Sequence, residues 1–307
     1  MTFGLLCSGQ GLQSATMFAL TAAEPQAAPI FAEAAEHLGC DPRRFVTETG
    51  TSALYENFTG QILCVTQALA AYACLKEALP VRLVIAGYSV GEMAAWSIAG
   101  AWTSHEVLSL VHTRADLMDE ASCTGDCLYA VRGLDRPLID DLCRRHHCEI
   151  AIINPDRLFV IGGSTPGICR LRDDALAAGA TRASALSIKV ASHTSRMAKA
   201  ITPFQLAINA ILARPLARSK TLLSGVDGLR IVDPRSESRK LACQIGTQLD
   251  WAACLDAMVE AKVDRLLEFG PGQALTNMAR SLSLFSEVRT LDDFRSVEGV
   301  RQWIVRH

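Results

Sequence analysis

A serine between two glycines is the strongest candidate for chemistry in this sequence. The segment 87–91 reads G-Y-S-V-G, with a nearly continuous β-branched apolar run at 81–86 before it and a helical pattern from 92 after it. A sharp strand-to-helix turn of this kind holds the serine in a strained conformation with its hydroxyl exposed. The motif therefore predicts that Ser89 is a nucleophile and that the backbone amide of Val90 stabilises an oxyanion. The alternative is a tight turn whose serine only caps the helix.

A nucleophilic serine needs a general base, and His193 is placed to supply it. It stands in A-S-H-T-S at 191–195, directly after a predicted strand that ends at Val190. The other histidines lie in helical patterns, in the charged run 144–147, or at the end of the chain. Strand ends are where α/β sheets bind ligands, so we predict that His193 is the base. An ordinary loop histidine is the alternative.

Two further positions could bind the reacting group. The segment S-G-Q-G at 8–11 lacks the third glycine of a dinucleotide fingerprint, but the amide of Gln10 could be a second oxyanion donor; a plain turn is the alternative. Arg114 falls inside the apolar stripe of the helical pattern at 104–121. A buried guanidinium needs an anionic partner, which is either an internal carboxylate or the carboxylate of a substrate.

These residues need a scaffold of strands alternating with helices, which predicts an α/β fold with a parallel sheet covered on both faces. The predicted strands of this sheet are 1–7, 81–86 and 263–269, and the predicted helices are 26–38, 57–78, 104–121 and those starting at 92 and 273. A different order, β-α-β-β-α-β, occupies the middle of the chain, with strands at 127–132, 149–154, 157–162 and 181–190 and helices at 137–146 and 166–178. This order is typical of a ferredoxin-like unit. We therefore expect a small domain at 125–190, inserted in a large domain formed by 1–124 and 191–307.

The charge balance excludes some classes of partner. The 307 residues carry 30 Lys and Arg against 32 Asp and Glu, a formal net charge of −2. A protein that binds nucleic acid or an anionic membrane surface would show a basic excess, so neither partner is expected. The uncharged stretch 57–75 is long enough to cross a membrane, but its Asn, Thr and Gln residues favour a buried helix.

The cysteines indicate a reducing compartment. There are eleven of them, no two form C-x-x-C, and several stand in apolar segments. This pattern favours buried, reduced thiols and a cytoplasmic protein without a secretory signal. Cys143 and Cys148 enclose two histidines, but the run R-R-H-H at 144–147 is typical of a solvated helix end, so no metal site is expected.

Together these motifs resemble the malonyl-CoA:acyl carrier protein transacylase family, the acyltransferases of fatty-acid and polyketide synthesis. The resemblance covers nearly the whole chain and includes G-Q-G at 9–11, the helix of Gln61, G-x-S-x-G-E at 87–92, Arg114, the ferredoxin-like insert, S-H at 192–193 and G-P-G at 270–272. It implies a large α/β-hydrolase-like domain with the inserted small domain. It also implies malonyl-CoA as a substrate, an acyl carrier protein as the partner, and no cofactor or metal.

The resemblance assigns roles residue by residue. Ser89 takes the acyl group, His193 is the base, and the amides of Gln10 and Val90 form the oxyanion hole. Arg114 holds the free carboxylate of the malonyl group, and Gln61, Tyr88 and Asp250 belong to the same substrate site. The family orients its histidine through a backbone carbonyl; the matching position is Asp250, and whether its carbonyl or its carboxylate acts is open. The reaction implied is a ping-pong transfer.

Some positions depart from the family pattern. Ser8 replaces the usual proline before G-Q-G, and Tyr88 replaces the histidine that commonly precedes the nucleophile. Both variants are similar to the epsilon subunit of malonate decarboxylase, which loads malonyl onto that complex's carrier protein; an enzyme of fatty-acid synthesis is the alternative. The segment V-A-S-H at 190–193 leaves malonyl or methylmalonyl selectivity open.

Two functions of other classes compete with the transferase. An α/β-type serine hydrolase or thioesterase would share the serine turn but would need an acid to complete its triad. A non-catalytic scaffold subunit would keep the fold around a dead site.

Overall fold

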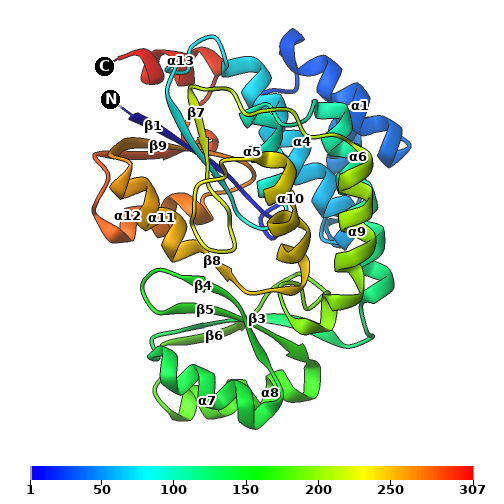
Figure 1. The fold of residues 1–307 in the computed structure, drawn as a ribbon, viewed down its shortest axis with the longest axis vertical. Helices are drawn as coiled ribbons and strands as arrows, with labels where there is room; N and C mark the ends of the chain where they lie inside the picture. Colours follow the sequence, from blue (N-terminus) through cyan, green and yellow to red (C-terminus); the bar gives the residue numbers. More distant parts are fainter. Residues whose placement is uncertain (1, 307) are drawn as a thin grey trace.

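A computed structural model describes residues 2–306 of the chain and contains two sheets (Figure 1). The larger sheet is parallel, with the strand order β10-β9-β1-β2-β7. Its strands are β1 (Thr2–Cys7), β2 (Leu83–Gly87), β7 (Lys220–Leu222), β9 (Val263–Phe269) and β10 (Glu287–Thr290). The predicted α/β class with a parallel sheet is confirmed. Met1, the first residue of the strand predicted at 1–7, lies outside the described residues.

Helices cover both faces of this sheet because its central strands are apolar on both sides. Along β1, Leu5 and Cys7 pack into one hydrophobic cluster, whereas Leu6 packs into another on the opposite face. The first cluster contains residues of α1 (Ala28–Leu38), α4 (Asn57–Leu75), α5 (Gly91–Ala99), α6 (Ser104–Ala121), α9 (Ala198–Ala210), α10 (Pro234–Cys243) and α13 (Val297–Val305). The second contains residues of α11 (Trp251–Glu260) and α12 (Ala274–Leu282).

The shorter elements connect these layers. They are α2 (Pro42–Glu48), α3 (Thr51–Leu54) and the 3₁₀ turns η1 (Pro25–Ala27), η2 (Ser195–Met197), η3 (Gln244–Gly246) and η4 (Leu291–Asp293).

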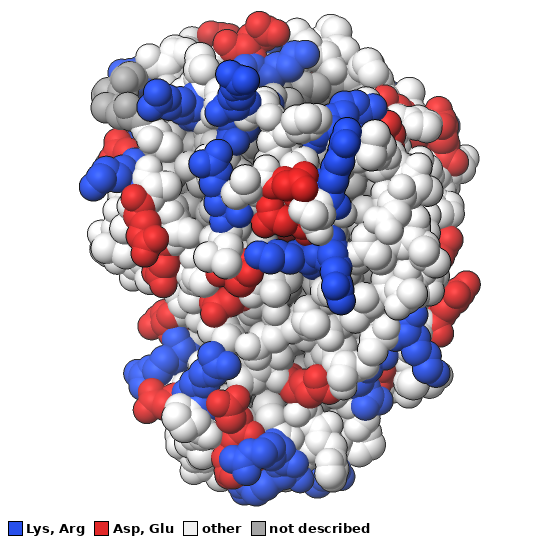
Figure 2. Space-filling model, in the orientation of Figure 1, with Lys and Arg blue, Asp and Glu red and all other residues white. Residues whose placement is uncertain are grey.

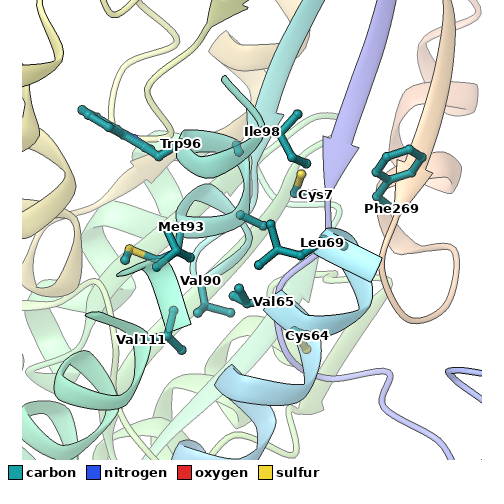
Figure 3. Packing of buried hydrophobic residues seen from close by; sticks show 14 of the residues in the cluster. Cys7, Cys64, Val65, Leu69, Val90, Met93, Trp96, Ile98, Val111 and Phe269 are labelled. Carbon is teal, nitrogen blue, oxygen red and sulfur yellow. The ribbon is translucent and has the colours of Figure 1, made fainter. Parts of the chain in front are cut away.

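The helix α4 is long and apolar enough to cross a membrane, but it lies inside the protein. Most of its length is buried, and it packs against α1, α5 and α6. Figure 3 shows Val65 and Leu69 of this helix beside Val90 and Met93 at the start of α5. The predicted buried helix is therefore confirmed, and its residues help to fix the turn that carries Ser89.

The second sheet has the order β6-β3-β5-β4-β8 and lies at the other end of the molecule (Figure 1). Its strands are β3 (Asp126–Arg132), β4 (Glu149–Asn154), β5 (Leu158–Ser164), β6 (Arg182–Ala185) and β8 (Leu249–Asp250), and it carries α7 (Arg136–His146) and α8 (Thr165–Ala177) on one face. The first four strands pair antiparallel, whereas β8 adds to β4 in parallel. The face opposite the two helices packs toward α11 through Ile152, Val160 and Trp251.

The strand predicted at 181–190 is wrong beyond Ala185. Residues 182–185 pair with β3, and the pairing ends where Ala185 lies opposite Tyr129. The chain then leaves the sheet, because Leu186 and Ile188 pack toward the larger sheet and Val190 is buried in the large core. Hydrophobic burial in an irregular segment therefore gave the same apolar pattern as a strand.

Candidate active site

Ser89 sits in a tight turn between β2 and α5. Its backbone is left-handed, with φ 54°, a conformation that is costly for a residue other than glycine. A Cβ added at Gly87 would lie 2.2 Å from the amide nitrogen of Glu92, and one at Gly91 would lie 2.1 Å from the carbonyl oxygen of Cys7. Both glycines are therefore required for the close approach of β1, β2 and α5 that holds the serine in place.

The hydroxyl of Ser89 meets the imidazole of His193, 104 positions later in the chain. The distance from Ser89 Oγ to His193 Nε2 is 2.7 Å, and the His193 side chain is almost fully buried, at 1% exposure. His193 is also left-handed, with φ 63°. The pair that the sequence proposed as nucleophile and base is thus in hydrogen-bond contact.

The turn η3 sets the orientation of His193. The backbone N–H of His193 donates to the carbonyl of Ile245 at 2.7 Å, and its ring Nδ1 lies 2.6 Å from the carbonyl oxygen of Gln244. A carbonyl oxygen can only accept, so Nδ1 carries the proton and Nε2 is left to accept from Ser89. This is the tautomer that a general base needs.

The expectation that Asp250 orients His193 is wrong. Asp250 ends β8 and caps α11, where its side chain accepts from the backbone N–H of Ala253 at 2.9 Å. Its own backbone N–H donates to the carbonyl of Gly225. Since any residue type can supply a backbone carbonyl, the sequence carried no signal that distinguished Gln244.

The electrostatics keep His193 neutral. The pKa of His193 is lowered to about 3, mainly by burial and also by the positive charge of Arg114, while the hydrogen bond to Gln244 acts in the opposite direction. At neutral pH the ring is therefore unprotonated at Nε2 and ready to take a proton.

Two backbone amides beside the serine turn have no acceptor among the described residues. Gly9 lies against the turn, since a Cβ added there would be 2.7 Å from the Tyr88 carbonyl oxygen and 3.5 Å from Ser89 Cβ. Among residues 2–306, no group accepts a hydrogen bond from the backbone N–H of Gln10 or of Val90. Figure 3 shows the Val90 side chain packed in the core, which fixes its peptide unit. Both amides are available as donors at the site.

A buried carboxylate anchors the loop that carries Gln10. Ser8 donates through Oγ to Glu268 Oε1 at 2.7 Å, and Glu268 also accepts from the backbone N–H groups of Leu275 and Thr276 at the start of α12. Burial raises the pKa of Glu268. The serine that replaces the family's proline therefore has its own structural partner. The side chain of Gln10 adds a contact by donating to the carbonyl of Asn57 at 3.1 Å.

Arg114 is fully buried and held by neutral groups. It donates through Nη1 to Gln61 Oε1 and through Nη2 to Gln244 Oε1, the latter at 3.2 Å. Gln61 is fixed in turn by Asn57, at 2.8 Å. In the part of the chain that the structure describes, Arg114 forms no ion pair and its Nε has no acceptor. Of the two partners considered from the sequence, an internal carboxylate is therefore not in contact.

Arg114 remains charged in this environment. Burial lowers its pKa to about 10, and the charge of Glu92 acts in the opposite direction. At neutral pH the guanidinium is still protonated, and the amide oxygens around it do not neutralise it. A positive charge held this way favours an anionic ligand.

A cavity of about 230 Å³ opens at Ser89 and His193 between the two sheets. Its walls are mainly apolar and include Leu128, Ile152 and Val160 of the second sheet and Leu275 and Met278 of α12. Tyr88 and Gln10 also line it, and the Tyr88 ring packs edge-on against Trp251 at 5.3 Å. Arg114, Gln61 and Asp250 lie outside the lining. Arg114 contacts Gln61 and Gln244, and Asp250 lies at the start of α11.

Two residues of the site were given no role from the sequence, although Glu92 closes the motif G-x-S-x-G-E. Gln244 supplies the carbonyl for His193 and an amide oxygen for Arg114. Glu92, three residues after the serine, is 1% exposed and accepts from the Gln244 amide. An acidic residue in the first turn of a helix is usually explained by the helix dipole, so its burial was not apparent.

Known proteins resemble this chain over nearly its full length. A family model described as an acyl transferase domain matches residues 5–228. The malonyl CoA-acyl carrier protein transacylase of Haemophilus influenzae is 27% identical over 311 residues, covering 99% of each chain. The crystal structure of an acyl carrier protein S-malonyltransferase from Vibrio cholerae has a TM-score of 0.88 at 26% identity, over 97% of this chain and 99% of that one. A malonyl-transacylase in complex with its type II PKS acyl-carrier protein has a TM-score of 0.90 at 26% identity, over 98% and 99%.

Proposed function

Because the chain belongs to the family of acyl transferase domains, we propose that it moves a malonyl group from malonyl-CoA to the phosphopantetheine-type thiol of an acyl carrier protein. The observation that carries the proposal is the contact between Ser89 and a neutral, oriented His193. Arg114 is buried, shares Gln244 with His193, and is unpaired with any carboxylate of residues 2–306. The names of the relatives support the same substrate and partner.

The first half-reaction forms an ester on Ser89. His193 Nε2 takes the hydroxyl proton while Ser89 Oγ attacks the thioester carbonyl of malonyl-CoA. The amides of Gln10 and Val90 stabilise the tetrahedral oxyanion. The intermediate then collapses, the carbon–sulfur bond breaks, and CoA leaves with the proton from His193.

The second half-reaction passes the malonyl group on. The thiol of the carrier protein gives its proton to His193 and attacks the Ser89 ester. Collapse returns the proton to Ser89 Oγ and releases the malonyl-carrier thioester. The enzyme is then ready for another malonyl-CoA.

Arg114 is proposed to bind the free carboxylate of the malonyl group. Its neutral partners, Gln61 and Gln244, form weaker hydrogen bonds than a carboxylate would, so the substrate can replace or supplement one of them. Gln61, Gln10 and Tyr88 are proposed to complete the substrate site. An acetyl group has no charge to offer Arg114 and should bind less well.

The same geometry separates the transferase from its rivals. A triad hydrolase would place an acid on the Nδ1 side of the histidine, and this position is taken by the carbonyl of Gln244. The apolar walls of the cavity also disfavour water as the acceptor. A scaffold would not need Ser89 and His193 held 2.7 Å apart in left-handed conformations.

Residues 125–190 are proposed to act as the inserted domain that closes over the thioester, since β3, β4 and β5 supply one wall of the cavity.

An acidic carrier would be attracted by basic side chains. In Figure 2 these gather over the region of β7 and α10 and again over α7 and α8. The arginines of α7 pair with Asp140 and Asp141, whereas Arg218, Arg230 and Arg235 surround a hollow beside β7.

Two pathways use this chemistry. The variants Ser8 and Tyr88 favour the loading subunit of malonate decarboxylase, with the other subunits of that complex as partners; fatty-acid synthesis is the alternative. All eleven cysteines are free thiols, which is compatible with the proposed cytoplasmic location.

Intact-mass measurement tests the proposal directly. After incubation with malonyl-CoA, wild-type protein should gain one malonyl group, and Ser89→Ala should gain none. Carrier protein should then remove the adduct and become malonylated. Parallel reactions with methylmalonyl-CoA and acetyl-CoA would define the acyl preference. Release of free malonate without malonyl-carrier would show a hydrolase, and the absence of an adduct on wild-type protein would favour the scaffold.

A further inference from the structure

Glu92 lies one helical turn beyond Ser89 and points away from solvent. Its side chain is 1% exposed, and three donors surround it. Oε2 accepts from the backbone N–H of Gly225 at 3.0 Å and from Gln244 Nε2 at 2.5 Å, while Oε1 accepts from Trp96 Nε1 at 3.3 Å. A buried carboxylate is costly unless it is paired in this way, so its position needs an explanation.

Gln244 connects Glu92 to both Arg114 and His193. Its side-chain oxygen accepts from Arg114 at 3.2 Å, and its backbone carbonyl accepts from His193 at 2.6 Å. A side-chain amide has one accepting and one donating end. Because a carboxylate only accepts, Glu92 takes the donating end and directs the oxygen of Gln244 toward Arg114. The reverse orientation would place two donors against each other at Arg114.

We propose that Glu92 is a positioning residue for malonyl transfer, which fixes Gln244 and through it the orientations of both His193 and Arg114. The inference rests on the proposed function and adds to it a group that does not touch the substrate. It explains why base and guanidinium, from different parts of the chain, share one partner.

The charge of Glu92 gives the inference a pH signature. The pKa of Glu92 is raised to about 7, mainly by burial and to a smaller extent by the negative charge of Asp227, while the hydrogen bonds from Gly225, Trp96 and Gln244 act in the opposite direction. The other titratable groups that interact with it are Arg114 of α6 and Cys254 of α11. As pH falls through this value Glu92 becomes protonated, and its hold on Gln244 and its compensation of Arg114 weaken. Acylation should therefore decline on the acid side of neutrality.

The test compares Glu92→Gln with Asp126→Asn. Asp126 is a buried carboxylate of the second sheet, paired with Arg196, and is the matched control for the loss of such a group. Single-turnover acylation by malonyl-CoA would be followed from about pH 5 to about pH 9. We expect Glu92→Gln to lower kcat/KM about tenfold at high pH, since a small misplacement of catalytic or substrate-binding groups costs this much or more. We also expect the variant to lose the decline in acylation rate that wild-type protein shows as pH falls below neutrality. Asp126→Asn should retain the decline in acylation rate at low pH.

A double-mutant cycle separates positioning from packing. Gln244→Ala retains the carbonyl that orients His193 but removes the amide that Glu92 holds. If Glu92 acts through Gln244, the effects of Glu92→Gln and Gln244→Ala should be strongly non-additive. Additive effects, or wild-type rates with an unchanged pH profile in Glu92→Gln, would overturn the inference.

A phosphonofluoridate probe keeps this result distinct from a failure of the proposed function. The probe reports the reactivity of Ser89 without any acyl-CoA. If wild-type protein reacts with the probe but not with malonyl-CoA, the proposed function fails and the role of Glu92 is judged from the probe alone. Equal labelling of wild-type protein and Glu92→Gln at every pH would then overturn the positioning role of Glu92.

Discussion

Replacing Arg114 by alanine should remove the preference for malonyl over acetyl. The guanidinium is fully buried, donates to two neutral amide oxygens and has an Nε without an acceptor in the described chain. A malonyl carboxylate would form a charge-assisted pair with it, and losing a buried pair of this kind costs about 2–4 kcal/mol. Since 1.36 kcal/mol is a factor of ten, the ratio of kcat/KM values should fall by about 30-fold to about 900-fold.

The acetyl reaction serves as an internal reference. Acetyl-CoA carries no carboxylate, so its kcat/KM should fall only through the loss of a partner for Gln244 and Gln61. Leaving these buried amide oxygens unpaired should also reduce the free energy of unfolding by about 1–3 kcal/mol. Selectivity and stability are thus separate consequences of one substitution.

The assay is a competition between malonyl-CoA and acetyl-CoA for the same serine. Intact-mass spectrometry gives the ratio of the two adducts after a short reaction, and this ratio does not depend on the fraction of folded enzyme. The control is Arg265→Ala, which removes another buried arginine outside the lining of the cavity, one that donates to the carbonyls of Trp303 and Ile304 and pairs with Glu287. It should lower stability and leave the ratio unchanged.

A single result would refute the reasoning. If Arg114→Ala still formed the ester on Ser89 with the wild-type ratio of malonyl to acetyl, the guanidinium would not bind the substrate carboxylate. Its role would then be to support Gln61 and Gln244, and the selectivity would have to come from the cavity wall.

Two further substitutions test other parts of the structure. Asp250→Ala should lower the free energy of unfolding in urea by about 1 kcal/mol through loss of the α11 cap, with acylation rates unchanged; a large loss of acylation would return Asp250 to the site. Burial and the neighbouring His112 lower the pKa of His37, so the unfolded chain binds this proton first and stability falls as pH drops below 6.5. His37→Gln should therefore flatten part of the acid loss in urea titrations, and an identical pH dependence in variant and wild type would contradict this.

The parts of the site that depend on side-chain type could be predicted from the sequence. A serine turn requires glycines where two backbones nearly touch, and Gly87 and Gly91 meet this condition. An arginine in an apolar stripe must be buried, as Arg114 is. A histidine directly after an apolar run was the predicted base, and Nε2 of His193 lies 2.7 Å from Oγ of Ser89. In each case the residue type itself limits what the surrounding structure can be.

The parts that depend on the backbone could not be predicted in this way. The partner of His193 is a carbonyl of Gln244, and every residue has a carbonyl. The resemblance to the family assigned this role to Asp250, but the carboxylate of Asp250 caps α11 instead. The segment 186–190 has the apolar pattern of a strand but is irregular, because burial between two sheets needs no strand pairing. The local apolar pattern of a sequence indicates which residues are buried. Contacts with residues distant in the chain determine which conformation the buried segment adopts.

The arrangement around Gln244 explains why nucleophile and base need so much of the chain. Ser89 and His193 both occupy left-handed conformations, and each such residue costs about 1–3 kcal/mol that the surrounding contacts must offset. For Ser89 these contacts come from β1, β2 and α5, and for His193 from η3. Glu92 belongs to the first group and Gln244 to the second, and their hydrogen bond joins the two. The buried hydrogen bond between Glu92 and Gln244 therefore links the contacts that keep Ser89 and His193 in their strained conformations. Weakening either set of contacts should disturb both residues.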